Sequence, residues 1–276
     1  MFVNGPNGRV TFGWDLTYLC NYHCPYCTVW DQSSPPAVSV AEWSRHWERM
    51  HRLYGECYIY MSGGEPSVYP HFIELVKALT RWHIVDICTN LSWKVQDLIP
   101  AISTDRLRIA ATFHPSHVRM ERFLPNVLAV KDYLPMRDEG RVVYYVAYPS
   151  QVPLMSQQAA LLKGHGLALV ALPFVATDHV MGNTDEEKEV IRAVSSNRED
   201  QQKMEYQLKE LSPKGRMCRA GQRYAMIRGD GRVDRCSQFT DRQLGAFVDD
   251  RFKLWSEPKL CTVEWCPYES QWIVND

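Results

Sequence analysis

Short, β-rich apolar runs alternate with helical patterns from residue 10 to about residue 174 of the chain. We interpret six runs as strands: residues 9–15 (RVTFGWD), 57–62 (CYIYMS), 83–89 (HIVDICT), 107–113 (LRIAATF), 141–148 (RVVYYVAY) and 167–174 (LALVALPF). Strands that alternate with helices predict a parallel sheet with right-handed crossovers, and such units can form a partial (β/α)6 barrel of the TIM type. An open, doubly wound sheet is the alternative α/β architecture.

Apolar residues at helical spacing fill the intervals between the predicted strands. The clearest helix begins at Ser39, which forms a Ser-x-x-Glu capping box with Glu42. The same periodicity predicts four further helices, at residues 72–79, 95–99, 123–130 and 153–163. In either architecture, the loops at the carboxyl ends of the strands carry the chemistry.

The C-terminal part of the chain has a different pattern. A polar helical stretch over residues 184–211 precedes MCRAGQRYAMIRGDGRVDRC, residues 217–236. Two strands flank Gly229-Asp230-Gly231 in this segment, and we expect a hairpin because the glycines accept positive φ angles. The sequence therefore predicts a barrel over residues 1–183, a connecting helix over 184–214, and a small hairpin-containing domain over 215–276.

Composition and charge narrow the possible functions. The chain has 31 Lys and Arg residues against 32 Asp and Glu residues, which gives no general basis for nucleic-acid binding. There is no signal peptide pattern and no run of about 18 apolar residues, so we expect a cytoplasmic protein without a membrane span. In that compartment, nine cysteines favour metal binding or chemistry over disulfides.

Three of the cysteines lie in CNYHCPYC, residues 20–27, directly after the first predicted strand. Three thiolates complete neither a disulfide pair nor a tetrahedral zinc site. They suit a 4Fe-4S cluster, in which each iron takes one thiolate, so that one iron stays open to a substrate or cofactor. A zinc knuckle completed by a histidine is the competing interpretation.

Cys20, Cys24 and Cys27, with the aromatic Tyr26 before the third cysteine, resemble the signature of the radical SAM superfamily. The segment SGGEP, residues 62–66, follows the second predicted strand, as the corresponding segment does in that family. The resemblance implies a 4Fe-4S cluster and S-adenosylmethionine, which is cleaved reductively to a 5'-deoxyadenosyl radical. It also implies an external one-electron reductant such as flavodoxin or ferredoxin. The residues expected to line the site of the methionine amine are Gly63, Gly64, Glu65 and Pro66.

Further residues at strand ends are assigned by the same resemblance. Thr89 and Asn90 follow the third strand and are expected near the methionine or the ribose. Thr112 ends the fourth strand, and Arg122 in the next helix is expected to reach the cofactor carboxylate. The family usually has an aspartate that contacts the ribose after the fourth strand, and this chain departs from that pattern with His114.

His114 and Asp178 are the candidate catalytic residues. His114 lies in the loop TFHPSH, where a near-neutral pKa suits a proton acceptor or hydrogen-bond donor that faces the substrate. Asp178 and its neighbour His179 follow the sixth strand. The competing interpretations are a loop histidine that holds the turn before Pro115, and a solvated loop after the sixth strand.

A second set of cysteines lies in the C-terminal segment: Cys218, Cys236, Cys261 and Cys266. Their arrangement resembles the twitch domain, a shortened relative of the SPASM domain of radical SAM enzymes, and this implies an auxiliary 4Fe-4S cluster. A structural zinc bound by four thiolates is the alternative. Cys57 and Cys88 lie in apolar strands and are expected to be small buried side chains.

Three functions are compatible with these patterns. The first is a radical SAM oxidoreductase or isomerase that dehydrogenates or epimerises a small organic substrate, such as a sugar-like or natural-product precursor. The second is a radical SAM maturase of a ribosomally made peptide. Because the first strand begins near Arg9, we expect no leader-binding domain before the barrel, and this favours the small molecule. The third is a non-catalytic metal-binding scaffold, which does not explain SGGEP.

Overall fold

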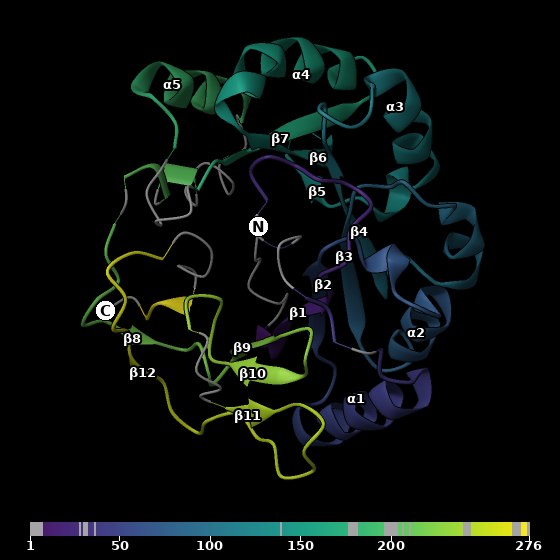
Figure 1. The fold of residues 1–276 in the computed structure, drawn as a ribbon, viewed down its shortest axis with the longest axis vertical. Coiled ribbons are helices and arrows are strands. Elements are labelled where there is room, and N and C mark those ends of the chain that lie inside the picture. Colours follow the sequence, from purple (N-terminus) through teal and green to yellow (C-terminus); the bar gives the residue numbers. More distant parts are fainter. Residues whose placement is uncertain are drawn as a thin grey trace.

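Six parallel strands form the centre of the molecule, and helices cover their outer side (Figure 1). The computed structural model describes residues 8–27, 29, 33–35, 37–138, 140–175, 182–195, 204–205, 207–209, 211–239, 244–266 and 272–274. The six strands are β1 (Thr11–Thr17), β2 (Tyr58–Gly63), β3 (Ile84–Thr89), β4 (Leu107–Phe113), β6 (Gly140–Ala147) and β7 (Leu167–Pro173). Each pairs in parallel with the next.

This sequential strand order confirms the partial α/β barrel. A doubly wound sheet needs a point where the strand order reverses, and the described barrel strands have none. The six predicted strands are all present, with boundaries shifted by at most two residues. The short strand β5 (Met136–Arg137), which pairs antiparallel with β6, was not predicted.

The described residues include the α-helices α1 (Val40–Tyr54), α2 (Phe72–Leu79), α3 (Met120–Ala129), α4 (Met155–Lys163) and α5 (Asp185–Val194). The Ser39 side chain accepts a hydrogen bond from the Glu42 N–H at 3.2 Å, as the capping pattern predicts. Short 3-10 helices are η2 (Pro66–Val68), η5 (Lys131–Tyr133) and η6 (Pro149–Leu154). No helix among the described residues has both the length and the apolar character to cross a membrane.

The helix predicted at residues 95–99 is wrong in type. The chain instead forms two 3-10 turns, η3 (Val95–Asp97) and η4 (Ile99–Ala101). Pro100 lies at the start of η4, and it lacks the N–H that an α-helix would require while disfavouring the α conformation of the residue before it. Val95 and Leu98 are still fully buried, so the apolar pattern reported burial correctly.

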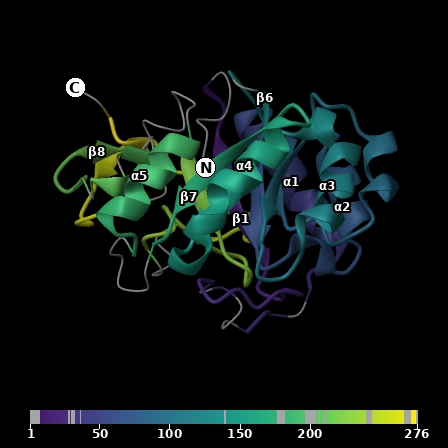
Figure 2. The same cartoon turned by 90° about the horizontal axis from the view of Figure 1, so that it is seen from above.

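The predicted C-terminal hairpin extends the barrel sheet. β9 (Tyr224–Ile227) pairs antiparallel with β10 (Arg232–Asp234) and in parallel with β1. β11 (Gly245–Ala246) continues the sheet, while β8 (Met217–Cys218) and β12 (Lys259–Leu260) form a separate antiparallel pair. The C-terminal segment lies on the side of the barrel away from α2 and α3 (Figures 1 and 2). Of the connecting helix, α5 covers residues 185–194, and residues 196–203 lie outside the described residues.

The two glycines of the hairpin turn serve different purposes. Gly231 has a φ of 80°, as expected for the turn, but Gly229 does not take a positive φ. A Cβ on Gly229 would lie 3.0 Å from the ring of Tyr18. The Gly229 N–H donates a hydrogen bond to the Tyr18 hydroxyl at 3.2 Å. The requirement for glycine at position 229 therefore comes from its close approach to Tyr18, just before the cysteine-bearing loop.

A buried aromatic cluster fixes the C-terminal segment against α1. Phe247, which follows β11, is fully buried with its ring centroid 4.6 Å from that of Trp47 and 5.9 Å from that of Trp43. Trp14 on β1 contacts Trp43 at 4.7 Å from the other side. Because these rings bury large apolar areas, they make the C-terminal hairpin part of the same core as the barrel.

Candidate functional site

Backbone contacts hold the cysteine loop against the end of β2. The Gly64 N–H donates to the Thr17 carbonyl at 2.7 Å, and the Glu65 N–H donates to the Leu19 carbonyl at 2.9 Å. A Cβ on Gly64 would lie 2.0 Å from the Leu19 oxygen, and one on Gly63 would lie 2.2 Å from the Thr17 oxygen. Only glycine permits this approach, so the glycines of SGGEP set the position from which the cysteine loop starts.

One cavity of about 210 Å³ opens at the carboxyl ends of the barrel strands, and Cys20, Cys24 and Cys27 all line it. The other predicted site residues in its wall are Tyr26, Gly63, Gly64, Glu65, Thr89, Asn90, Thr112 and His114. These residues meet because parallel strands present their carboxyl ends at the same edge of the barrel.

The three cysteines fit a multi-iron cluster. The Tyr22 N–H donates to Cys20 Sγ at 3.3 Å and the Val29 N–H donates to Cys27 Sγ at 3.4 Å, and such donors favour the thiolate. Burial raises the pKa of the Cys20 thiol, and it raises the pKa of Cys24 to about 11, so a bound cation is needed to deprotonate them at neutral pH.

No three Cys, His, Asp or Glu side chains of the described residues are grouped to hold a single metal ion. A zinc knuckle requires such a group, whereas a cubane cluster takes each thiolate on a different iron. None of the nine cysteines, each of them among the described residues, forms a disulfide. The three thiols that line the cavity match the three thiolate positions of such a cluster.

Glu65 is a buried carboxylate that accepts hydrogen bonds from Ser67, Thr89 and Asn90. Its Oε1 accepts hydrogen bonds from the Thr89 hydroxyl at 2.8 Å and the Ser67 N–H at 3.2 Å, and its Oε2 accepts one from the Asn90 N–H at 2.8 Å. Burial raises the pKa of Glu65, and these donors oppose the rise. A carboxylate has about four lone-pair positions, and the Ser67 side chain is a further donor beside this carboxylate.

Thr89 and Asn90 position other parts of the site. The Thr89 hydroxyl donates to Glu65 and accepts from the Leu91 N–H at 3.1 Å and the Trp93 indole N–H at 2.9 Å, which uses its full capacity. The Asn90 amide donates to the side-chain oxygen of Asn21 at 2.9 Å. Thr89 thus orients Glu65, and Asn90 connects the end of β3 to the cysteine loop.

His114 lies against the cysteine loop. Its Nδ1 is 2.7 Å from the Tyr26 hydroxyl and 3.5 Å from Cys24 Sγ, and the Tyr26 and His114 rings stack. Burial, with a smaller effect of His117, lowers the pKa of His114 to about 4. The expectation of a near-neutral pKa is therefore wrong, because the loop excludes the water that would solvate an imidazolium.

Several predicted residues lie elsewhere. Arg122, on α3, is exposed and does not line the cavity, and Pro66 is buried at the start of η2, outside the cavity wall. Asp178 and His179 lie outside the described residues. Thr112 is buried in the wall, with its hydroxyl 3.9 Å from Cys88 Sγ.

Sequence reasoning missed four residues of the cavity wall: Tyr22, Cys88, Val146 and Leu172. Cys57 is fully buried as expected, but Cys88 is only partly buried and faces the barrel interior with Tyr60 and Tyr144. The strict alternation of side chains along β3 was the available signal, because alternate residues of a barrel strand point inward.

The four C-terminal cysteines are all buried. Cys218, Cys236 and Cys261 belong to one apolar cluster with Tyr224 and Trp272, two aromatic residues whose rings stack. The Ala220 N–H donates to Cys218 Sγ at 3.4 Å, the same backbone-to-sulfur contact as at Cys20 and Cys27. Among the described side chains, these cysteines too are not grouped around a single metal ion.

A partial barrel that carries three cysteines after β1 and a Gly-Gly-Glu segment after β2 has the architecture of a radical SAM domain. Residues 14–111 match the family model described as the Radical SAM superfamily. This superfamily uses a 4Fe-4S cluster and S-adenosylmethionine.

Curated relatives match about a third of the chain. Mycofactocin maturase MftC of Mycobacterium ulcerans is 32% identical over 91 residues, which are 32% of this chain and 24% of the relative. PqqA peptide cyclase of Rhodopseudomonas palustris is 31% identical over 99 residues, which are 35% of this chain and 24% of the relative. The matches thus span about a quarter of the length of these relatives.

Solved structures share the fold over most of the chain. Streptococcus suis SuiB bound to S-adenosylmethionine has a TM-score of 0.61 and 13% identity, covering 88% of this chain and 64% of SuiB. Native anSMEcpe with bound AdoMet and Cp18Cys peptide has a TM-score of 0.60 and 14% identity, covering 87% of this chain and 77% of that protein. At these identities the likeness establishes the fold.

Proposed function

We propose that the chain is a radical SAM enzyme that matures a ribosomally made peptide. The observation that carries the radical SAM assignment is the meeting of Cys20, Cys24 and Cys27 with Gly64 and Glu65 around one cavity. The names of the curated relatives, a maturase and a peptide cyclase, support a peptide substrate. These names favour a peptide over the small organic molecule. A peptide substrate does not require a leader-binding domain in this chain, because a leader-binding partner can be a separate chain.

Different residues of the cavity are proposed to bind the cluster, to bind the methionine ammonium and to limit water. Cys20, Cys24 and Cys27 would hold the 4Fe-4S cluster, which together with S-adenosylmethionine supplies the hydrogen-abstracting radical. Glu65 lines the same cavity, where its carboxylate would pair with the methionine ammonium through a charge-assisted hydrogen bond. Val146 and Leu172 contribute apolar surface that limits water in the cavity.

We assign His114 a role toward the substrate, because it lies in the cavity wall where the family usually has an acidic residue. A His114→Gln variant should still cleave S-adenosylmethionine but give less modified substrate per cleavage. Measuring 5'-deoxyadenosine and product in the same reaction separates the two effects. Equal losses of both would place His114 with the cofactor or the fold instead.

The C-terminal segment, residues 215–276, is proposed to hold an auxiliary 4Fe-4S cluster through Cys218, Cys236, Cys261 and Cys266. Four thiolates occupy all four irons, so this cluster would have no open position for a substrate. Its role would then be electron transfer. The burial of the four thiols and the backbone contact to Cys218 support this assignment.

The test is reductive cleavage by anaerobically reconstituted protein. Wild-type protein with a one-electron reductant should form 5'-deoxyadenosine, and a panel of precursor peptides should contain one that raises the rate. The Cys20→Ala, Cys24→Ala, Cys27→Ala triple variant should form none, whereas Cys57→Ala, in the core away from the cavity, should keep the activity.

Each alternative has its own outcome. Continued 5'-deoxyadenosine formation by the triple variant would show that the central assignment is wrong. Stimulation by amino sugars or cyclitols and by none of the peptides would favour the small-molecule enzyme. Cluster binding without any cleavage in the wild type would leave the scaffold function.

A further inference from the structure

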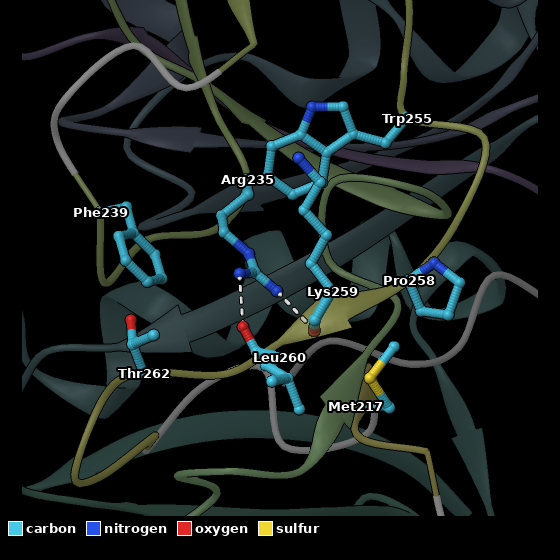
Figure 3. Close-up of a pocket in the computed structure, with 8 residues that line it drawn as sticks. All are labelled: Met217, Arg235, Phe239, Trp255, Pro258, Lys259, Leu260 and Thr262. Atoms are coloured by element: carbon cyan, nitrogen blue, oxygen red, sulfur yellow. Dashed lines mark hydrogen bonds between the residues drawn. The ribbon is translucent and has the colours of Figure 1, made fainter.

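Arg235 is a buried cation that pairs with no carboxylate of the described residues. Its side chain is 4% exposed, and its Nη1 and Nη2 donate to the carbonyl oxygens of Leu260 at 3.1 Å and Lys259 at 3.3 Å (Figure 3). The guanidinium lies 5.3 Å from the ring centroids of both Phe239 and Trp255. Within the part of the chain that the structure describes, Nε has no hydrogen-bond partner and no carboxylate pairs with the guanidinium.

Arg228, another arginine of the same hairpin, is paired with carboxylates. Arg228 is also largely buried, and its Nε donates to the Asp234 carboxylate at 2.9 Å while Nη1 lies 3.6 Å from Asp15. A buried charge is costly unless it is paired, and carbonyls and aromatic faces compensate only part of that cost. Arg235 therefore lies where an anion is expected.

The surroundings of Arg235 identify that anion. Arg235 directly precedes Cys236, and its guanidinium lies beside the Cys218 thiol. The Leu260 carbonyl that it binds belongs to the residue before Cys261. One side chain thus contacts the segments of three of the four C-terminal cysteines. The thiolates of these cysteines are the negative charges available to it.

We propose that Arg235 is the counter-cation of the auxiliary cluster and raises its reduction potential. The inference rests on the proposed auxiliary cluster in the C-terminal segment. Four thiolates give a 4Fe-4S cluster a net negative charge that increases on reduction, and a nearby fixed cation stabilises the more negative state. Through the Lys259 and Leu260 carbonyls, Arg235 also positions the Cys261 segment against the Cys236 segment.

The test is a redox titration of the auxiliary cluster, followed by electron paramagnetic resonance. The Cys20→Ala, Cys24→Ala, Cys27→Ala protein is the parent, because its only expected cluster is the C-terminal one. Arg235→Gln removes the charge and should shift the midpoint potential to a more negative value. Arg235→Lys keeps the charge and should stay closer to the parent.

Lys259→Gln is the matched control. Lys259 is exposed, and its Nζ lies 3.8 Å from the ring centroid of Trp255 in the same pocket. The Lys259→Gln substitution removes a positive charge that is exposed to solvent, so the midpoint potential of the cluster should change little. A shift in Lys259→Gln as large as in Arg235→Gln would show a general charge effect and overturn the specific role of Arg235.

The remaining outcomes also decide the proposal. An unchanged potential in Arg235→Gln overturns it. If Arg235→Gln loses its iron, retention of iron by Arg235→Lys supports the counter-charge, and loss from both overturns it in favour of packing. A parent with zinc or without iron overturns the proposal too, while 5'-deoxyadenosine formation by wild-type protein still tests the radical SAM assignment separately.

Discussion

The guanidinium of Arg228, in the turn of the β9–β10 hairpin, lies 3.6 Å from the carboxylate of Asp15 on β1. The Arg228 Nη2 also donates to the carbonyl oxygens of Ser237 and Phe239, each at 2.9 Å. This buried arginine therefore links the first barrel strand to the loop that follows Cys236. Through it, the two cysteine-bearing parts of the chain share one polar network.

Asp15 makes the stability of the protein depend on pH. Burial raises its pKa from 3.8 to about 6, although Arg228 opposes the rise. Protonation of Asp15 therefore favours the folded state, and this contribution is complete below about pH 4 and lost as the pH rises through 6. Asp15→Asn removes the titration, so its free energy of unfolding relative to wild type should rise by about 2 kcal/mol from pH 4 to pH 7.

Urea unfolding at each pH measures this difference. Asp105→Asn, at an exposed position, is the control substitution. A difference between Asp15→Asn and wild type that does not vary with pH would show that Asp15 has the same pKa in the folded and unfolded states. A difference that falls with rising pH would reverse the assigned direction.

Gly64→Ala tests the contact between the cysteine loop and β2. The added Cβ would lie 2.0 Å from the Leu19 carbonyl oxygen, so the loop before Cys20 must move. We expect a loss of about 1–3 kcal/mol in the free energy of unfolding and a lower iron content after reconstitution. Gly164→Ala, at the end of α4, meets no atom closer than 3.3 Å and is the control. Retention of both properties in Gly64→Ala would show that the approach is unnecessary for the site.

Glu65→Gln tests the carboxylate at the cavity. The amide keeps the size of the side chain but removes its charge. Its NH₂ group cannot accept a hydrogen bond, so at least one of the bonds from Ser67, Thr89 and Asn90 would be lost. Binding of S-adenosylmethionine to the reconstituted protein should weaken by about 1.5–3 kcal/mol, which is roughly tenfold or more. Glu56→Gln, just before β2 at its opposite end, is the control. Unchanged affinity, measured by equilibrium dialysis, would argue against Glu65 as the ligand of the ammonium.

The Cys236→Ala, Cys266→Ala double variant tests the second cluster by metal analysis. About four irons should be lost relative to wild type, because four thiolates hold one cubane cluster. Cleavage of S-adenosylmethionine at the first cluster should persist. Stoichiometric zinc in the wild type, with equal iron in both proteins, would remove the electron-transfer role and leave the C-terminal segment as a structural cap.

The sequence alone determined the barrel strands and the location of the candidate site. Short runs such as residues 107–113 are apolar over the length of a strand, and β4 has those bounds. Once such strands are parallel, their carboxyl ends share one edge, so SGGEP and CNYHCPYC had to meet. Local rules were equally sufficient at Ser39, where the cap depends only on neighbouring residues.

The tertiary structure alone decided how distant segments combine. The apolar pattern of residues 224–227 predicts a buried strand, β9, but it does not identify β1 as the strand that pairs with it. The approach of Gly229 to Tyr18 and the pairing of Arg228 with Asp15 both follow from that sheet arrangement. The physical reason is that strand pairing and side-chain burial depend on contacts between residues far apart in the chain, whereas periodicity and capping report only local preference.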